Sequence, residues 1–325
     1  MILLALAGCA HTLGRSTVHY GPPEPLPIVR TAVDSRWYVP IEVEGLGLWA
    51  FFVDTGYSFS TCDDGLIEAL GLETHGRSVL RGELGRVRTT KAQLPQLQLG
   101  GHTLDGVVCQ VRDLDRTSSI RDTREVRIAG VLGMDVLRPF VVEMDPEQGR
   151  IHLRDPNEAE PLDETDPQVV RVRRERIFGM RAQLPITLNG RQVWPVVDTG
   201  ASGTHLDGDR LDLEPTRVRE DVRVRGSGGG GSAVQTVVYY EVTDLVLGGM
   251  NPGPLVVTGR SGGVGAGLLG LNLLSNYVAT YDFGRGLAKF ESVLPRRLPT
   301  WSEWRSAAYP PQGTRLKAPQ SEALE

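Results

Sequence analysis

Short runs of alternating hydrophobic and polar residues dominate this chain. Residues 39–43 and 184–188 alternate as half-buried strands do, and after a tight turn each leads into a wholly apolar run, at 48–53 and 193–197. The turn before the second run is an Asn-Gly pair, which is a strong signal for a β-hairpin. Because the other runs are also short and bounded by Gly and Pro, the pattern predicts an all-β fold.

The pattern occurs twice, as an internal repeat of roughly 140 residues. In both copies an apolar strand, a glycine at Gly133 or Gly270, a short helical segment and a closing hairpin follow one another in the same order. The spacing from Gly133 to Asp145 equals the spacing from Gly270 to Asp282. The repeat predicts two homologous lobes related by a pseudo-twofold axis, with one short helix in each lobe.

Each apolar run ends on the same tripeptide, Asp54-Thr55-Gly56 in the first copy and Asp198-Thr199-Gly200 in the second. A carboxylate at the end of a buried strand, on a turn that glycine makes easily, is costly to keep there. One such tripeptide is compatible with an ordinary turn, but two behind matching strands indicate a paired site. We expect Asp54 and Asp198 to meet at the pseudo-twofold axis and to share one proton, as carboxylates that activate water do.

Composition favours no other chemistry. Of the 325 residues 40% are hydrophobic and 23% are charged, and the net charge is −5, so the chain is an ordinary globular protein with room for two cores. The basic residues are scattered along the sequence, which gives no support for nucleic-acid binding. The six histidines show no metal-ligand spacing, and we expect neither a metal nor a cofactor.

The repeat and the stretches around it divide the chain into six segments. These are an apolar signal-like segment at 1–8, a Pro-rich tether at 9–30, a first lobe at 31–156, an acidic linker at 157–178, a second lobe at 179–293 and a tail at 294–325. The tail has no clear periodicity, so it either packs locally on the second lobe or is loose.

The first residues resemble the lipobox of bacterial lipoproteins, because small residues precede Cys9. This resemblance implies lipidation at Cys9 and a lipid anchor in the cell envelope, facing the periplasm. Ala10 after the cysteine implies retention in the outer membrane by the lipoprotein sorting pattern. The alternative is a disordered apolar start with an incidental cysteine.

Two further cysteines, Cys62 and Cys109, lie in the first half of the chain. An oxidising periplasm would allow a disulfide between them, and two independent buried thiols fit the sequence equally well. No histidine lies in a comparable motif around either cysteine, which argues against cysteine catalysis.

Each copy of the repeat resembles a retropepsin-type aspartic protease domain. The shared features are apolar-apolar-Asp-Thr-Gly, a later apolar-apolar-Gly segment, a short helix and a closing hairpin, and they cover residues 36–155 and 180–292. Two such lobes in one chain are similar to the arrangement of pepsin-like enzymes, here with the short lobes of bacterial members. The resemblance implies closed-barrel-like lobes, a monomer and an aspartic endopeptidase acting on peptides or proteins.

The resemblance also implies roles for single residues. Asp54 and Asp198 would be the catalytic pair. The active-site loops would be supported by Thr55, Gly56, Ser58, Thr199, Gly200 and Ser202, and from beneath by Gly133 and Gly270. The two threonines would hydrogen-bond across the lobe boundary; the alternative is that they cap only their own turns.

The first loop departs from the family pattern at Tyr57, where relatives place Ser, Thr or Ala. Either the phenol enters the cleft and shapes a substrate pocket, or the first loop is distorted. Neither Tyr57 nor Ala201 supplies a small hydroxyl that would stabilise an ionised carboxylate. We therefore expect a mildly acidic to neutral pH optimum.

Such a protease needs hairpins that cover its cleft. Glycines lie at the expected distance after each aspartate, Gly82 and Gly85 in the first copy and Gly226 and Gly228 in the second. The second run lacks the Lys-Ser/Thr of a phosphate-binding loop, so a flap tip is favoured over a ligand loop, and an artificial linker is the remaining alternative.

The sequence therefore supports an envelope-tethered aspartic endopeptidase as the leading hypothesis. The alternative is a catalytically inactive lipoprotein of the same fold that binds peptides or envelope proteins.

Overall fold

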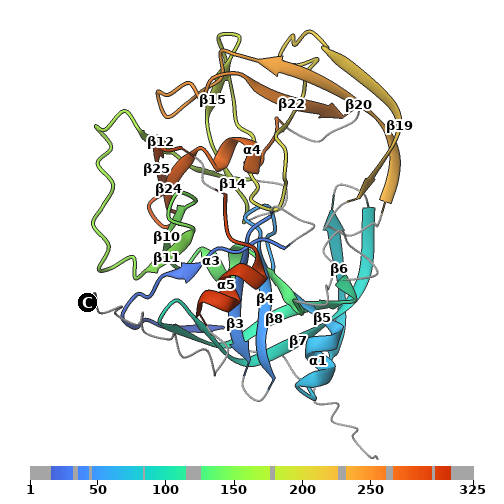
Figure 1. Ribbon diagram of the computed structural model, residues 1–325, viewed down its shortest axis with the longest axis vertical. Coiled ribbons are helices and arrows are strands. Elements are labelled where there is room, and N and C mark those ends of the chain that lie inside the picture. The colour runs from blue at the N-terminus through green and yellow to red at the C-terminus, as the bar shows by residue number, and fades with distance from the viewer. Residues whose placement is uncertain are drawn as a thin grey trace, which may run out of the picture.

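The computed structural model describes residues 16–31, 36–43, 46–82, 85–114, 126–175, 180–225, 232–260, 266–294 and 297–308. They form two lobes, drawn one above the other in Figure 1. Cys9, Gly226 and Gly228 lie outside the described residues.

One eight-stranded sheet forms the first lobe. Its strands are β1 (Thr17–His19), β3 (Tyr38–Val43), β4 (Gly47–Val53), β5 (Thr61–Asp63), β6 (His75–Gly82), β7 (Gly85–Leu99), β8 (His102–Arg112) and β9 (Ile128–Leu132). Their order is β3-β4-β9-β5-β8-β7-β6, with β1 added to β8. Two helices accompany the sheet, α1 (Asp64–Ala69) and α3 (Met134–Leu137).

Strand β4 carries apolar side chains on both faces. Trp49, Phe51 and Val53 lie in the main core, while Ala50 and Phe52 lie in a second, smaller cluster. Successive side chains of a strand point to opposite faces, so a run without polar positions must be covered on both sides. This is why the apolar run before Asp54 is a central strand, paired with β3 and β9.

The second lobe repeats this plan with two sheets. The larger contains β13 (Arg173–Arg174), β14 (Ala182–Gln183), β17 (Val196–Val197), β18 (His205–Leu206), β19 (Arg217–Arg225), β20 (Ser232–Val242), β22 (Leu255–Arg260) and β23 (Gly267–Leu269). The smaller contains β15 (Ile186–Leu188), β16 (Arg191–Val193) and β21 (Val246–Leu247). Helix α4 (Leu271–Leu274) takes the place of α3.

Two local features of the repeat are confirmed. The strand before each Asp-Thr-Gly pairs in parallel with the strand before the later glycine, β4 with β9 and β17 with β23. The Asn-Gly turn joins β15 to β16, with positive φ angles of 50° at Asn189 and 70° at Gly190. Such angles match the right-handed twist of a hairpin and suit these two residue types.

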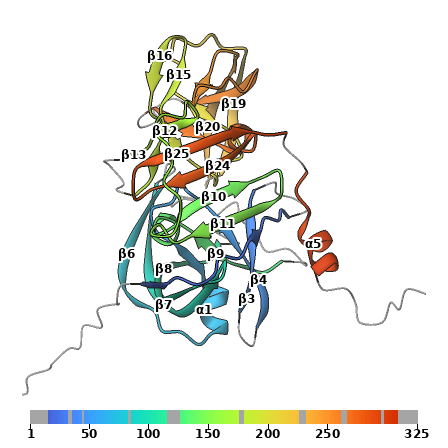
Figure 2. The ribbon, with the colours of Figure 1, turned by 90° about the vertical axis from the view of Figure 1, so that its left-hand side faces the viewer.

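A six-stranded sheet joins the lobes, and it lies between them in Figure 2. Its strands, in order, are β12 (Val169–Arg171), β25 (Leu287–Ser292), β24 (Tyr277–Asp282), β10 (Val141–Asp145), β11 (Arg150–Arg154) and β2 (Leu26–Pro27). Strands β10 and β24 are equivalent in the two copies and pair antiparallel at the centre. An antiparallel pair of equivalent strands is what a twofold axis between the lobes requires, so the two-lobed prediction is confirmed.

The start of the described chain is packed against the first lobe. Residues 16–30, which the sequence places in a tether, include β1 on β8 and β2 on β11. Ile28 and Val29 are fully buried. Apolar side chains between the prolines of this stretch explain the difference, because they cover surface that the lobe would otherwise expose.

The tail returns to the first lobe instead of packing on the second. Helix α5 (Trp301–Ala308) places Trp301 in the same buried cluster as Phe52 and Val29. The Arg30 N–H donates to the Pro299 carbonyl at 3.1 Å, and the Trp301 N–H donates to the Arg30 carbonyl at 2.9 Å. The tail therefore covers the outer face of β4.

Two details differ from the fold predicted by the resemblance. The described strands form no closed barrel: the sheets end at β3 and β6 in the first lobe and at β13 and β19 in the second. Strands β6 and β19 belong to long hairpins that extend toward the other lobe and do not return to close the sheet (Figure 1). The single short helix per lobe fits α3 and α4, but the first lobe also has α1, whose start is capped by the Asp63 side chain accepting from the Gly65 N–H at 3.0 Å.

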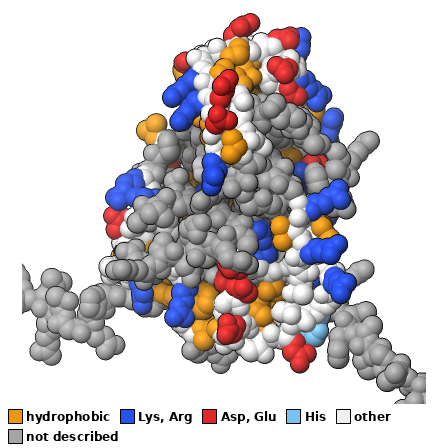
Figure 3. Space-filling model, turned by 90° about the vertical axis from the view of Figure 1, so that its right-hand side faces the viewer, with side chains coloured by type: hydrophobic (Ala, Val, Ile, Leu, Met, Phe, Trp, Pro, Cys, Tyr) orange, Lys and Arg blue, Asp and Glu red, His pale blue; other side chains and the backbone are white. Residues whose placement is uncertain are grey.

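The two hairpins are β6–β7 and β19–β20, one in each lobe. The last pairs are Gly82 with Gly85 in the first and Arg225 with Ser232 in the second. Both lie on the same side of the molecule in Figure 1, the side that Figure 3 shows in space-filling form.

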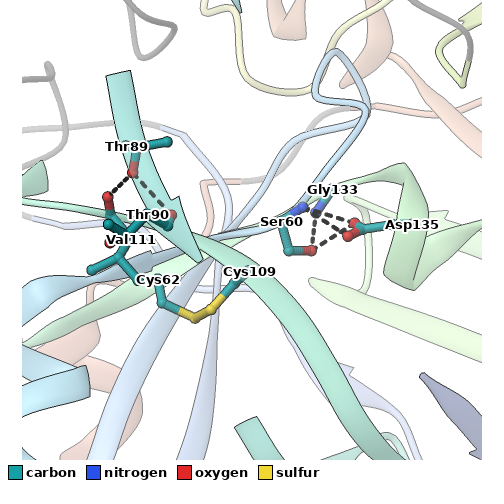
Figure 4. The surroundings of a disulfide bond; sticks show 8 residues. All are labelled: Ser60, Cys62, Thr89, Thr90, Cys109, Val111, Gly133 and Asp135. Atoms are coloured by element: carbon teal, nitrogen blue, oxygen red, sulfur yellow. Dashed lines mark hydrogen bonds between the residues drawn. A yellow bond between two sulfur atoms is a disulfide. The ribbon is translucent and has the colours of Figure 1, made fainter. Parts of the chain in front are cut away.

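Cys62 and Cys109 form a disulfide between the adjacent parallel strands β5 and β8, with their Cα atoms 5.6 Å apart (Figure 4). Both side chains lie in the main core. Of the two alternatives left open by the sequence, the structure therefore has the disulfide. It ties the strand that follows the Asp54 loop to the centre of the sheet.

Candidate active site

Asp54 and Asp198 occupy equivalent positions at the ends of the central strands. The Asp54 N–H donates to the Leu132 carbonyl of β9, and the Asp198 N–H donates to the Leu269 carbonyl of β23, both at 3.0 Å. The parallel strand beside each loop thus holds the aspartate backbone. Asp54 is buried, with 2% of its surface exposed, and Asp198 is partly buried.

Each carboxyl rests on the glycine of the opposite loop. A Cβ atom added to Gly56 would lie 2.4 Å from Cγ of Asp198, and one added to Gly200 would lie 2.3 Å from Oδ2 of Asp54. Real Cβ atoms do not approach other atoms so closely, so these two positions accept only glycine. The exchange brings the two carboxyl groups together, and a hydrogen bond joins their side chains.

Thr55 and Thr199 link the two loops reciprocally. The Thr55 hydroxyl accepts from the Thr199 N–H at 3.1 Å and donates to the Val197 carbonyl at 3.0 Å. The Thr199 hydroxyl accepts from the Thr55 N–H at 3.1 Å and donates to the Val53 carbonyl at 2.9 Å. Both threonines are fully buried. The hydrogen bonds therefore cross the lobe boundary, and the alternative of caps confined to each turn is not the arrangement in the structure.

The electrostatics of the pair follow from its burial. Removal from water raises the pKa of the Asp54 carboxyl well above its ordinary value, and the neighbouring Asp198 carboxyl raises it further by charge and by hydrogen bonding. The Gly56 N–H, which donates to Asp54 Oδ1 at 2.8 Å, and the charge of Arg36 oppose this rise in pKa. The pair can therefore keep one proton on Asp54 at pH values where an ordinary aspartate has lost it.

A second pair of side chains supports the loops from beneath, and the sequence prediction missed it. Ser60 donates its hydroxyl to Asp135 at 2.7 Å and accepts from the Gly133 N–H at 3.0 Å (Figure 4). In the second lobe Thr204 donates to Asn272 at 2.8 Å and accepts from the Gly270 N–H at 3.1 Å. The signal was present in the repeat, because Ser60 and Thr204 follow their aspartates at the same distance.

Gly133 and Gly270 lie where the loops pass over them. A Cβ atom on Gly133 would lie 3.0 Å from the Tyr57 carbonyl oxygen, and one on Gly270 would lie 2.8 Å from the Ala201 carbonyl oxygen. Ser202 contacts this layer through its backbone carbonyl, which accepts from the Asn272 N–H at 3.1 Å. The side-chain hydrogen bonds that the sequence analysis assigned to the Ser58 and Ser202 positions are made two residues further on.

Tyr57 leaves the first loop undistorted. Its N–H donates to the Asp54 carbonyl at 3.2 Å, the same distance as between the Ala201 N–H and the Asp198 carbonyl. The ring packs at the edge of the smaller cluster, and the hydroxyl hydrogen-bonds to Arg112, whose side chain is buried. Burial raises the pKa of the Tyr57 phenol, so it stays neutral. Of the two alternatives for this residue, distortion of the loop is excluded, and a role in a substrate pocket stays a prediction.

Other sites are not evident in the described part of the chain. No group of three or more His, Cys, Asp or Glu side chains there is placed to hold a metal ion. Among the same residues, none of the helices has the length and apolar character needed to cross a membrane.

A protein-family model described as aspartyl protease matches the chain in two regions, residues 39–136 and 184–273. Each region contains one Asp-Thr-Gly loop and ends within helix α3 or α4. No curated protein matches the chain.

The threonine network predicts a stability loss that depends on the hydroxyl. Thr55→Val should lower the free energy of unfolding by about 1–3 kcal/mol, because it leaves the buried Thr199 N–H and Val197 carbonyl without partners. Thr55→Ser, which keeps the hydroxyl, should lose less. The double variant with Thr199→Val should lose less than the sum of the single losses, since the two residues share one network. Urea unfolding measures all four proteins, and equal losses for the Val and Ser variants would contradict the prediction.

The raised pKa of Asp54 predicts a stability change with pH. As pH rises, Asp54 ionises in the unfolded chain while it stays protonated in the native one, so the wild type loses stability relative to Asp54→Asn. The difference in Tm, variant minus wild type, should therefore increase between about pH 4 and pH 7.

Asp163→Asn is the control with the opposite sign. Hydrogen bonds from the Thr165 backbone and hydroxyl lower the pKa of the exposed Asp163 carboxyl, so its difference in Tm should decrease as pH rises. Calorimetry over this pH range measures both variants, and a flat difference for Asp54→Asn would count against the buried, proton-sharing pair.

Proposed function

The chain belongs to the aspartyl protease family, and on this basis we propose that it is an endopeptidase that hydrolyses peptide bonds with water activated by Asp54 and Asp198. The observation that supports this most directly is the exchange of supports, in which each carboxyl rests on the glycine of the opposite loop. This arrangement leaves two carboxyl groups hydrogen-bonded to each other at the boundary between the lobes.

The proposed mechanism uses the unequal burial of the pair. Asp54, the more buried acid, keeps the shared proton, and the negative charge lies on Asp198. Asp198 takes a proton from water as the oxygen attacks the scissile carbonyl carbon, and Asp54 gives its proton to the carbonyl oxygen. When the tetrahedral intermediate collapses, Asp198 gives its proton to the leaving nitrogen, the C–N bond breaks, and Asp54 regains the proton from the hydroxyl that becomes the carbonyl.

The threonine network and the glycines supply rigidity to this mechanism. Because the loops are joined by hydrogen bonds between fully buried groups, the two carboxyl groups need little reorganisation during the reaction. The hairpins β6–β7 and β19–β20 are the elements placed to cover an extended peptide, which would bind as an added strand.

We also propose that the chain is lipid-anchored through Cys9 and faces the periplasm, where it acts as a monomer. The Cys62–Cys109 disulfide supports this location, because such bonds persist in oxidising compartments.

Cleavage of a peptide library tests the enzymatic proposal. The wild type should cleave extended peptides, and Asp54→Asn and Asp198→Asn should each lower kcat by about 10²–10⁴-fold, because each variant removes an acid–base group. Thr165→Val, on the surface of the linker, serves as the matched control. Peptide binding without turnover by the wild type would instead support the alternative, a non-catalytic peptide-binding lipoprotein.

The pH profile of this reaction gives a second readout of the same prediction. Because the pKa of Asp54 is raised, the singly protonated pair persists to higher pH, and we expect an optimum at mildly acidic to neutral pH. A rate maximum below about pH 3 would contradict this expectation.

Fractionation tests the proposed location. In bacterial cells the chain with Cys9 should remain with the membranes and incorporate labelled fatty acid, whereas Cys9→Ala should be released and unlabelled. Membrane retention of the Cys9→Ala variant would reject the anchor and leave the enzymatic proposal untouched.

A further inference from the structure

The hairpins β6–β7 and β19–β20 concentrate positive charge in a chain whose net charge is −5. Residues 75–91 contain five Lys or Arg and one acidic residue, and residues 217–240 contain four Arg and two acidic residues. These basic residues look scattered along the sequence, but the fold gathers them on one side of the molecule. Figure 3 shows Lys and Arg side chains over both lobes on this face.

Six of these arginines are exposed: Arg77, Arg86 and Arg88 on the first hairpin, and Arg217, Arg219 and Arg223 on the second. None of the six forms an ion pair with another described residue. Their guanidinium groups are therefore available to an external anion.

Each hairpin places an exposed valine opposite one of these arginines. Val79 lies across from Arg88, and Val234 lies across from Arg223. The two valines are 48% and 57% exposed. An apolar side chain beside a guanidinium offers contact to the stem and the head of an approaching side chain, which suits a polypeptide better than a small anion.

Both hairpins are rooted beside the candidate active site. In the first lobe the Gln110 N–H donates to the Ser60 carbonyl at 3.0 Å, and the Gln110 side chain donates to Ser78 of β6 at 3.2 Å. In the second lobe the Thr258 N–H donates to the Thr204 carbonyl at 3.0 Å, and Thr258 pairs with Tyr239 of β20. The positive hairpins thus rise from the strands that hold the two loops.

We propose that these hairpins form a basic docking surface that selects protein substrates with acidic residues on both sides of the scissile bond. The inference rests on the proposed endopeptidase function and adds a substrate class to it. A positive surface at the entrance of a cleft raises the local concentration of acidic segments and speeds their association. Arginine also binds carboxylates through two parallel hydrogen bonds, which adds specificity to the charge.

Two peptides with one central sequence test the docking surface, one flanked by Glu and the other by Gln. For the wild type at low salt, kcat/KM should be about 10-fold or more higher for the Glu-flanked peptide. The ratio should approach one at about 1 M salt, where charges are screened within a few ångströms.

Matched variants locate the effect. The triple variants R77Q/R86Q/R88Q and R217Q/R219Q/R223Q should each lower the ratio of the two kcat/KM values. The control R174Q/R210Q/R305Q removes three exposed arginines outside both hairpins and should keep the wild-type ratio. Equal kcat/KM for the two peptides at low salt, or an unchanged ratio in both hairpin variants, would overturn the docking surface and leave the endopeptidase function standing.

Binding separates the failure of this inference from the failure of the function. If the wild type cleaves neither peptide, the endopeptidase proposal fails, and the docking surface is tested by fluorescence anisotropy of the same labelled peptides with Asp54→Asn. Salt-sensitive preference for the Glu-flanked peptide supports the surface, and equal binding overturns it. Tight binding of DNA or anionic vesicles without that preference also overturns it, because it assigns the arginines to another class of partner.

Discussion

Four hydrogen bonds between Thr55, Thr199 and the opposing backbone hold the two halves of the site together. They join segments about 144 residues apart in the chain, in a place that water does not reach. Every other feature of the pair depends on this register. The glycines can lie beneath the opposite carboxyl groups, and the acids can share a proton, only while the loops stay in contact.

The two loops are nearly alike, but their surroundings are not. The first lobe carries the Cys62–Cys109 disulfide, the packed N-terminal strands and the returning helix α5. The second half of the chain has no cysteine. Cross-links and buried apolar contacts therefore gather behind Asp54, the acid with the raised pKa, and keep the more buried member of the pair fixed.

Electrostatics act on this molecule at two ranges. At short range, burial and a neighbouring carboxyl govern the protonation of Asp54, with Arg36 opposing them. At longer range, exposed arginines on two hairpins face solvent on one side of an otherwise negative chain. The first effect concerns the bond that is broken, and the second concerns which polypeptides reach the cleft.

The sequence by itself determined the repeat, the all-β class and the two aspartates, because hydrophobic period and turn residues are local signals. It also located the Asn189-Gly190 hairpin, since that turn needs positive φ at both residues. Contacts between distant segments came only from the tertiary structure: the disulfide, the exchange of glycines beneath the carboxyl groups, the Ser60–Asp135 and Thr204–Asn272 pairs, and the return of Trp301 to the first lobe. No local pattern encodes such partners, because each is chosen by the packing of strands that meet only when the chain has folded.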